Sequence, residues 1–205
     1  MLLSYPMMDK IQYNRRQKQL IETFESIGLD NSAGDIGVSD ELKNEILENV
    51  YESENNRDSY TSNEHLIAEK HQDLEDVVGI IRISSIDLNM IIYNGASEEK
   101  LSKGIGMIET EKKIGINNVG LAGHRSTTYG KQFNRLDEVS LSDIIVVHTM
   151  NNTYEFEVIK SFVVHKSEIN VLDDQKEPLL TLVTCTPLGK KNPSERLIIQ
   201  AKLTK

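Results

Sequence analysis

Three residues that lie far apart in the sequence are of the types that thiol-based acyl transfer needs: Cys185, His124 and Arg196. A thiol attacks a carbonyl carbon as the thiolate, which nearby positive charge favours. The same chemistry needs an acid that protonates the departing amine and a hydrogen-bond donor for the developing oxyanion. Histidine and arginine meet those two needs, so these residues are the candidates for a catalytic site.

Cys185 is the only cysteine of the 205 residues, and a lone cysteine is more often a small buried hydrophobic residue than a nucleophile. Its position favours the nucleophile. The run LLTLVTC (179–185) predicts a strand whose last residue is Cys185, and Thr186 and Pro187 follow directly. A thiol at the end of a strand, beside a loop, lies where a substrate can reach it.

His124 and Arg196 are also predicted to lie at strand ends. His124 stands in LAGHRS, 61 residues before Cys185, and Arg196 follows Cys185 by eleven residues at the start of RLIIQAKL (196–203). Side chains alternate between the two faces of a strand, so Arg196 lies on the face opposite to the apolar set of this strand, together with Gln200 and Lys202. That apolar set is Leu197, Ile199, Ala201 and Leu203. Each signal is weak alone, but their joint order and placement are far more specific.

The elements that must position these residues are short strands, which begin at Val77. Segments rich in isoleucine and valine are separated there by turn-forming Gly, Asn, Asp and Pro. Only brief helices fit between them, at 98–103 and 131–136. The pattern predicts a mainly β domain built as a mostly antiparallel barrel or sandwich. The predicted strand segments are 77–95, 117–123, 143–149, 153–165, 179–185 and 196–203.

A helix is predicted before this domain, over residues 5–27, because Pro6 suits a first helical turn and Gly28 suits a helix end. Its apolar residues recur at helical spacing. They are Leu20, Phe24 and Ile27, and Ile11 is a further candidate nearer the start of the helix. The basic residues Arg15, Arg16 and Lys18 are expected on a solvated face, with contact to anionic lipid as the alternative.

The charge of the chain is concentrated in one segment. The net charge is −9, yet Asp30 to Asp76 holds fourteen acidic and three basic residues, so the remainder is close to neutral. This composition predicts a solvated linker or loosely docked helices, one of them at 40–50, and lacks the carboxylate spacing of an EF-hand calcium site. The expected organisation is a helix (1–28), an acidic segment (29–76) and a β domain (77–205).

Composition also excludes several classes of function. The chain has no basic stripe with interleaved aromatic residues, so nucleic acid is not an expected partner. It has neither a cysteine pair nor histidines at metal-ligand spacing, so no metal site is expected. The sequence contains no run of about 18 apolar residues, which is the length that a membrane-spanning helix needs. The opening MLLSYPMM does not match a signal peptide and could be the end of a membrane anchor absent from this chain.

The segments LAGHRSTTYGKQFNRLDEV, TLVTCTP and RLIIQAKL together resemble the sortase family of Gram-positive bacteria. In that family a TLxTC motif carries the nucleophile, a histidine lies upstream at a strand end, and an arginine begins the final strand. VVGIIRISSIDLNMIIYNG is similar to the family's opening strands. The resemblance extends from about Val77 to Leu203.

The resemblance implies a role for four residues and a fold. Cys185 would be the nucleophile, His124 the general acid and later the base, and Arg196 the residue that stabilises the oxyanion and holds the substrate. Thr184 would help to line the substrate pocket. The implied fold is a closed, eight-stranded sortase β-barrel, here with short helices and an N-terminal helical extension.

The implied reaction is transpeptidation on the extracellular face of the cell membrane. Cys185 would attack the Thr carbonyl of an LPxTG-like or LPxTA-like sorting signal near the C-terminus of a secreted protein. An amine of a peptidoglycan precursor or of a pilin lysine would then resolve the acyl-enzyme. A thioester retains acyl-transfer potential, so no metal, nucleotide or other cofactor is required.

Several alternatives stay open at this stage. STTYGKQFNRLDEV resembles class D sortases, whereas the N-terminal helix resembles class C pilin polymerases; the acidic segment lacks the Asp-Pro pair of a class C lid, which favours class D. A catalytically silent β-barrel surface module and a hydrolytic cysteine peptidase are the other readings.

The remaining histidines and Arg125 are expected to have structural or surface roles and no part in catalysis. His148 and His165 lie within strands and are expected to be structural, whereas His65 and His71 lie in the acidic segment and are expected to be solvated. Arg125 is expected to form a surface ion pair, with orientation of the substrate as the alternative.

Overall fold

A computed structural model of the chain describes residues 5–32, 74, 76–125, 131–190 and 192–205, and the side chains of the N-terminal helix from Ile11 to Ile27. Its β domain consists of eight strands. In chain order they are β1 (Val77–Ile83), β2 (Leu88–Asn94), β3 (Ile105–Met107), β4 (Asn118–Ala122), β5 (Ile144–His148), β6 (Thr153–His165), β7 (Leu179–Thr186) and β8 (Glu195–Leu203).

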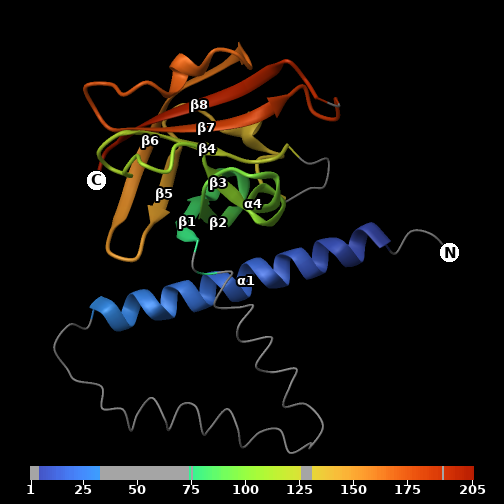
Figure 1. The fold of residues 1–205 in the computed structure, drawn as a ribbon, viewed down its shortest axis with the longest axis vertical. Helices are drawn as coiled ribbons and strands as arrows, with labels where there is room; N and C mark the ends of the chain where they lie inside the picture. Colours follow the sequence, from blue (N-terminus) through green and yellow to red (C-terminus); the bar gives the residue numbers. More distant parts are fainter. Residues whose placement is uncertain (1–4, 33–73, 75, 126–130, 191) are drawn as a thin grey trace, which may run out of the picture.

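The eight strands close into a barrel, which confirms the predicted fold class (Figure 1). Their order around the barrel is β1-β2-β3-β4-β7-β8-β6-β5, and the pairing of β1 with β5 closes it. Two of the neighbouring pairs, β2/β3 and β4/β7, are parallel. The three-residue strand β3 was missed at the sequence level, because a segment of this length has no measurable alternation.

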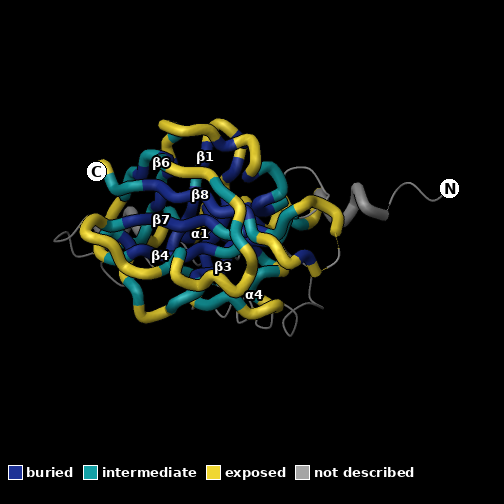
Figure 2. The backbone as a smooth tube through the Cα atoms, turned by 90° about the horizontal axis from the view of Figure 1, so that it is seen from above, coloured by how far each residue is buried: buried dark blue, intermediate teal, exposed yellow. Residues whose placement is uncertain are grey.

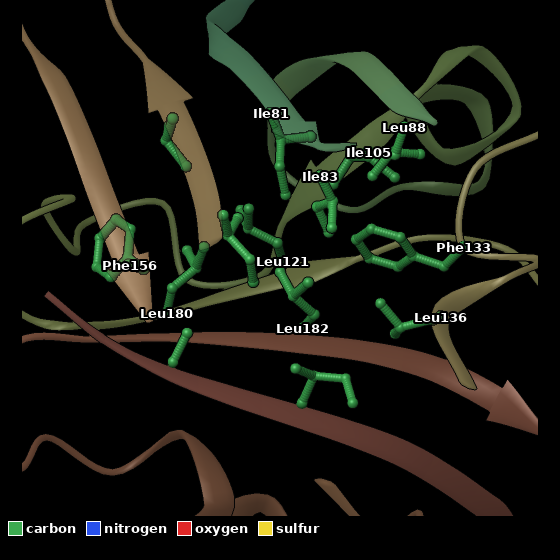
Figure 3. Packing of buried hydrophobic residues seen from close by; sticks show 14 of the residues in the cluster. Ile81, Ile83, Leu88, Ile105, Leu121, Phe133, Leu136, Phe156, Leu180 and Leu182 are labelled. Carbon is green, nitrogen blue, oxygen red and sulfur yellow. The ribbon is translucent and has the colours of Figure 1, made fainter. Parts of the chain in front are cut away.

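The interior of the barrel is filled by hydrophobic side chains, which are mostly aliphatic and include the rings of Phe133 and Phe156 (Figure 3). Alternate residues of each strand point inward, as the period of two requires. In β8 the inward residues include Leu197, Ile199 and Ala201, as the alternation predicted. The central parts of the strands are buried and the connecting turns are mostly exposed (Figure 2).

The outer face of β1 and β2 is also apolar, and the helix α1 (Tyr5–Ser32) covers it (Figure 1). Leu20, Ile21 and Phe24 of the helix form a second buried cluster. Their partners on the barrel are Ile80, Ile91 and Tyr93. Burying a large apolar side chain contributes about 1.5–3 kcal/mol, so this contact is a substantial part of the fold.

The helix differs from its prediction in two respects. It continues past Gly28 to Ser32, because a single glycine costs a helix only about 1 kcal/mol and does not end it. Its buried face also differs: Ile27 is 38% exposed and Ile11 is 40% exposed, whereas Gln17 is buried. Within the described part of the chain, no helix has the length and apolarity needed to cross a membrane.

The two short helices predicted within the β domain had opposite outcomes. The helix at Glu98–Lys103 (α4) is confirmed, and the Ser97 hydroxyl accepts a hydrogen bond from the Lys100 amide at its start. The helix predicted at 131–136 is wrong. Gln132 has a positive φ of 46°, which an α-helix does not allow, and a short 3-10 helix follows at Leu136–Glu138 (η2). The helix predicted at 40–50 lies outside the described residues.

Candidate active site

Cys185 and Arg196 face one another across two neighbouring strands. In the antiparallel pairing of β7 with β8, Cys185 is the direct partner of Arg196. Side chains of directly opposite residues lie on the same face of a sheet, with Cβ atoms about 4.5–5.5 Å apart. The strand β7 continues one residue past Cys185, to Thr186, so the thiol lies near the strand end and not at its last residue. It is half-buried.

His124 reaches the other side of Cys185 through the parallel pairing of β4 with β7. Leu121 pairs with Leu182 and Ala122 with Val183, and the Gly123 amide then donates to the Val183 carbonyl at 3.2 Å. Continuation of this register by one more residue sets His124 beside Cys185. The thiol therefore lies between the imidazole, which follows the end of β4, and the guanidinium, which lies on β8.

The backbone on both sides of the imidazole is held in place. The buried Thr184 hydroxyl donates to the Gly123 carbonyl at 2.8 Å, and the Phe133 amide donates to the His124 carbonyl at 3.1 Å. Gly123 itself has no room for a side chain, since an added Cβ would lie 2.7 Å from Phe133. Close packing at Gly123 thus fixes the backbone position from which the His124 side chain extends.

All four residues predicted for the site line one groove of about 870 Å³. They are Cys185, His124, Arg196 and Thr184. Thr184 is only 2% exposed, so its main contact is the hydrogen bond to Gly123 just described. Further basic side chains line the same groove, namely Arg125, Lys131, Lys166 and Lys190.

Arg196 is oriented by its own neighbourhood. Its Nη1 atom donates to the carbonyls of Pro193 and Glu195, at 2.8 and 2.9 Å. Among the described residues both hydrogen bonds come from this one nitrogen, and a guanidinium has five N–H donors. Donors on the rest of the group are therefore available to a ligand in the groove.

His124 has a carboxylate partner that the sequence did not indicate. Its Nε2 atom lies 3.3 Å from the Glu98 carboxylate, which belongs to α4 and is 87% exposed. The pair is ionic only when the imidazole is protonated. Glu98 was placed in the predicted helix, but nothing local to that helix signals a contact with a residue 26 positions later.

Arg125 forms an ion pair, but the expected surface location was wrong. Its side chain is 8% exposed, and its Nη2 atom lies 2.8 Å from the Asp137 carboxylate. Its Nη1 atom donates to the Thr186 hydroxyl at 2.9 Å. Arg125 thus ties the loop after β4 to the end of β7, one residue from Cys185.

The other described histidines have partners outside the groove. His148 Nδ1 lies 2.9 Å from the Thr153 hydroxyl, and Arg82 approaches its other ring nitrogen at 3.5 Å. His165 is exposed, with Nδ1 2.8 Å from the Ser167 hydroxyl. Both fit the predicted structural role. No group of three or more metal-ligating side chains occurs within the described ranges, and His65 and His71 lie outside them.

One further groove residue comes from the N-terminal helix. Tyr13 lines the groove together with Leu101 and Ser102 of α4. Sequence reasoning missed it, although a signal exists in the spacing of three or four residues, about one helical turn, that repeats along one face of the helix. The residues on this face are Tyr13, Gln17, Leu20 and Phe24.

A model of the sortase domain family matches residues 81–204, more than half of the chain. The chain belongs to the sortase family. The segments that carry His124, Cys185 and Arg196, from β4 to β8, lie within the matched sortase domain, and α1 lies outside it.

Relatives of three classes are similar to this sortase chain. Sortase A of Listeria monocytogenes is 29% identical over 113 residues, which cover 55% of this chain and 51% of the relative. The structure of the Clostridium perfringens sortase D5 transpeptidase is 30% identical with a TM-score of 0.56, covering 67% of this chain and 88% of that chain. That of Streptococcus pneumoniae sortase C is 28% identical with a TM-score of 0.58, covering 63% and 67%. The chain spans about half the length of the Listeria relative.

Proposed function

We propose that this protein is a cysteine transpeptidase that cleaves an LPxTG-like or LPxTA-like sorting signal after its Thr and transfers the acyl group to an amine. The observation that carries the proposal is the placement of Cys185 directly opposite Arg196 and beside His124 in one groove. Membership of the sortase family supports it.

The proposed reaction begins with the attack of the Cys185 thiolate on the Thr carbonyl carbon. The carbonyl electrons move to the oxygen, and Arg196 donates hydrogen bonds to this oxyanion. As the oxyanion collapses, the C–N bond breaks and His124 gives its proton to the departing amine. The product of this half-reaction is a thioester between the peptide and Cys185.

The second half-reaction reverses these roles. An incoming amine attacks the thioester carbon, and neutral His124 takes the proton that the nitrogen loses. The new oxyanion is again stabilised by Arg196 and collapses with expulsion of the Cys185 thiolate. A peptide bond replaces the thioester, and the chain returns to its starting state without an external energy source.

Secreted proteins with a C-terminal sorting signal are the proposed substrates, and a peptidoglycan precursor supplies the amine. We assign the enzyme to class D because of the segment after His124 and the lack of an Asp-Pro pair in the acidic segment. We further propose that it acts on the extracellular face of the membrane. A class C enzyme that uses a pilin lysine is the alternative, supported by the similarity to Streptococcus pneumoniae sortase C.

The test uses fluorogenic peptides that vary the positions of LPxTG, with and without triglycine as the amine. We expect a thioester on Cys185, seen by mass spectrometry, and a product that contains triglycine. Cys185→Ala should abolish both while its circular dichroism stays unchanged. Arg196→Lys should lose most of the rate, because a point charge cannot replace the planar donor fork.

Two outcomes would contradict this proposal in different ways. A product that never incorporates triglycine indicates a hydrolytic cysteine peptidase. An inert Cys185 in the folded protein, unreactive toward both peptides and iodoacetamide, indicates a silent β-barrel module.

A further inference from the structure

Tyr13 is part of the substrate groove although it lies outside the sortase domain. The family match begins at residue 81, whereas Tyr13 belongs to α1 and reaches the groove from the outer side of the barrel. Its ring packs against the main core cluster, and its hydroxyl points to the Met90 sulfur at 3.4 Å. The ring is therefore held in a defined position.

A buried glutamine one turn later fixes the register of the helix on the barrel. The Gln17 side chain is 5% exposed, its Nε2 donates to the Lys103 carbonyl at 2.5 Å, and its Oε1 accepts from the Ile91 amide at 3.2 Å. It thus joins α1 to both α4 and β2. Since a slip of α1 would leave these buried groups unpaired, the position of Tyr13 is well specified.

The ring of Tyr13 also has a cationic neighbour at the groove. The Lys131 ammonium lies 4.8 Å from the ring centroid, within the range of a cation–π contact. Burial raises the pKa of the Tyr13 hydroxyl well above its usual range. The residue therefore presents a neutral aromatic surface and not a phenolate.

The barrel order shows which flank of the site Tyr13 borders. Along β2-β3-β4-β7-β8, α1 packs on β2, His124 follows β4, and Arg196 lies on the opposite side of Cys185, on β8. The helix α4 links His124 to α1, since Glu98 contacts His124 and the Lys103 carbonyl accepts a hydrogen bond from Gln17. Tyr13 therefore lies on the His124 side.

We propose that Tyr13 of α1 is a substrate-contacting residue that binds the amine acceptor, a peptide whose N-terminal residues pack against its ring. This inference rests on the proposed function. His124 exchanges a proton with the leaving and the incoming amine, so both amines must occupy its side of the thiol. The wall on that side is built in part by Tyr13.

The test compares the two half-reactions in the full-length chain. In Tyr13→Ala we expect the KM for triglycine to rise about three- to tenfold, as removal of one aromatic contact predicts. The rate of acylation by the sorting peptide should stay within about twofold of wild type, because that peptide is also held through its residues before the cleaved bond, whereas the acceptor binds only on the amine side of the site. Tyr13→Phe should keep the wild-type KM for triglycine, because the ring and not the hydroxyl forms the wall.

Ile11→Ala is the matched control, since Ile11 is an exposed apolar residue of the same helix outside the groove; it should change neither step. An unchanged KM for triglycine in Tyr13→Ala, or an equal loss in acylation and transfer, would overturn the inference while the proposed function stands. A wild-type chain that no sorting peptide acylates overturns the proposed function and the inference with it.

Discussion

Thr184 shows how one residue of the site can act through its neighbour. It precedes the thiol, and family resemblance assigned it to the substrate pocket, yet its hydroxyl is buried and bonded to the Gly123 carbonyl. That bond links β7 to the chain just before His124. Thr184 is therefore placed to hold the imidazole at a constant distance from Cys185.

Thr184→Val should test this link, because valine keeps the shape and removes the donor. A buried carbonyl that loses its partner costs about 1–3 kcal/mol, which lowers Tm by several degrees in a chain of this size, at about 2–4 °C per kcal/mol. We expect kcat for acylation to fall as well. Differential scanning calorimetry and peptide kinetics provide the two measurements.

Thr23→Val is the control for that experiment, since the Thr23 hydroxyl makes an exposed bond to the Gln19 carbonyl within α1. A Thr184→Val variant as stable and as active as Thr23→Val would show that the hydroxyl does not position the site.

At the scale of elements, the docking of α1 on the barrel includes a charged contact beside the apolar one. Glu25 of the helix pairs with Arg82 of β1, and Arg82 in turn faces His148 of β5. Burial lowers the pKa of His148 and the Arg82 charge lowers it further, while Glu25 opposes both. The folded chain therefore favours a neutral His148.

This depressed pKa predicts how stability depends on pH. The histidine of an unfolded chain titrates at about pH 6.5, so below that pH the unfolded chain binds a proton that the folded chain resists. The free energy of unfolding should therefore fall as the pH drops from about 6.5 through the lower pKa of the folded state. Urea titrations at several pH values measure this slope.

Two substitutions should move the slope in opposite directions. His148→Gln removes the titrating group and should flatten it, while Glu25→Gln removes the charge that raises the His148 pKa and should steepen it. Equal slopes in all three proteins would mean that His148 does not control this pH dependence.

At the scale of the whole molecule, the eight strands that close the barrel all lie between Val77 and Leu203. We propose that 77–205 is a separate folding unit and that α1 is an added layer on it. The covered surface is nevertheless large and apolar, because Ile80, Ile91 and Tyr93 are each at most 2% exposed.

Deletion of residues 1–76 should therefore leave a folded but less stable barrel. We expect β-type circular dichroism, a lower Tm, and a tendency to associate through the uncovered face of β1 and β2, measured by size-exclusion chromatography. Phe24→Ala in the full chain should shift Tm in the same direction by less. An unfolded 77–205 fragment would show that α1 belongs to the folding unit.

The sequence alone determined the features that depend on local pattern. Strand alternation placed Arg196 away from the core, as the inward set around Leu197 confirms, and the Glu98–Lys103 helix follows from its own residues. The motifs around His124, Cys185 and Arg196 indicated the sortase family, which the match over 81–204 confirms.

Only the tertiary structure decided what those residues meet. The register that sets Cys185 opposite Arg196 and carries His124 beside it arises from pairing between strands up to about 60 residues apart, and no local pattern encodes such contacts. The same holds for Tyr13 and Gln17: helical periodicity shows that they share a face with Phe24, but packing on β2 decides that this face borders the groove.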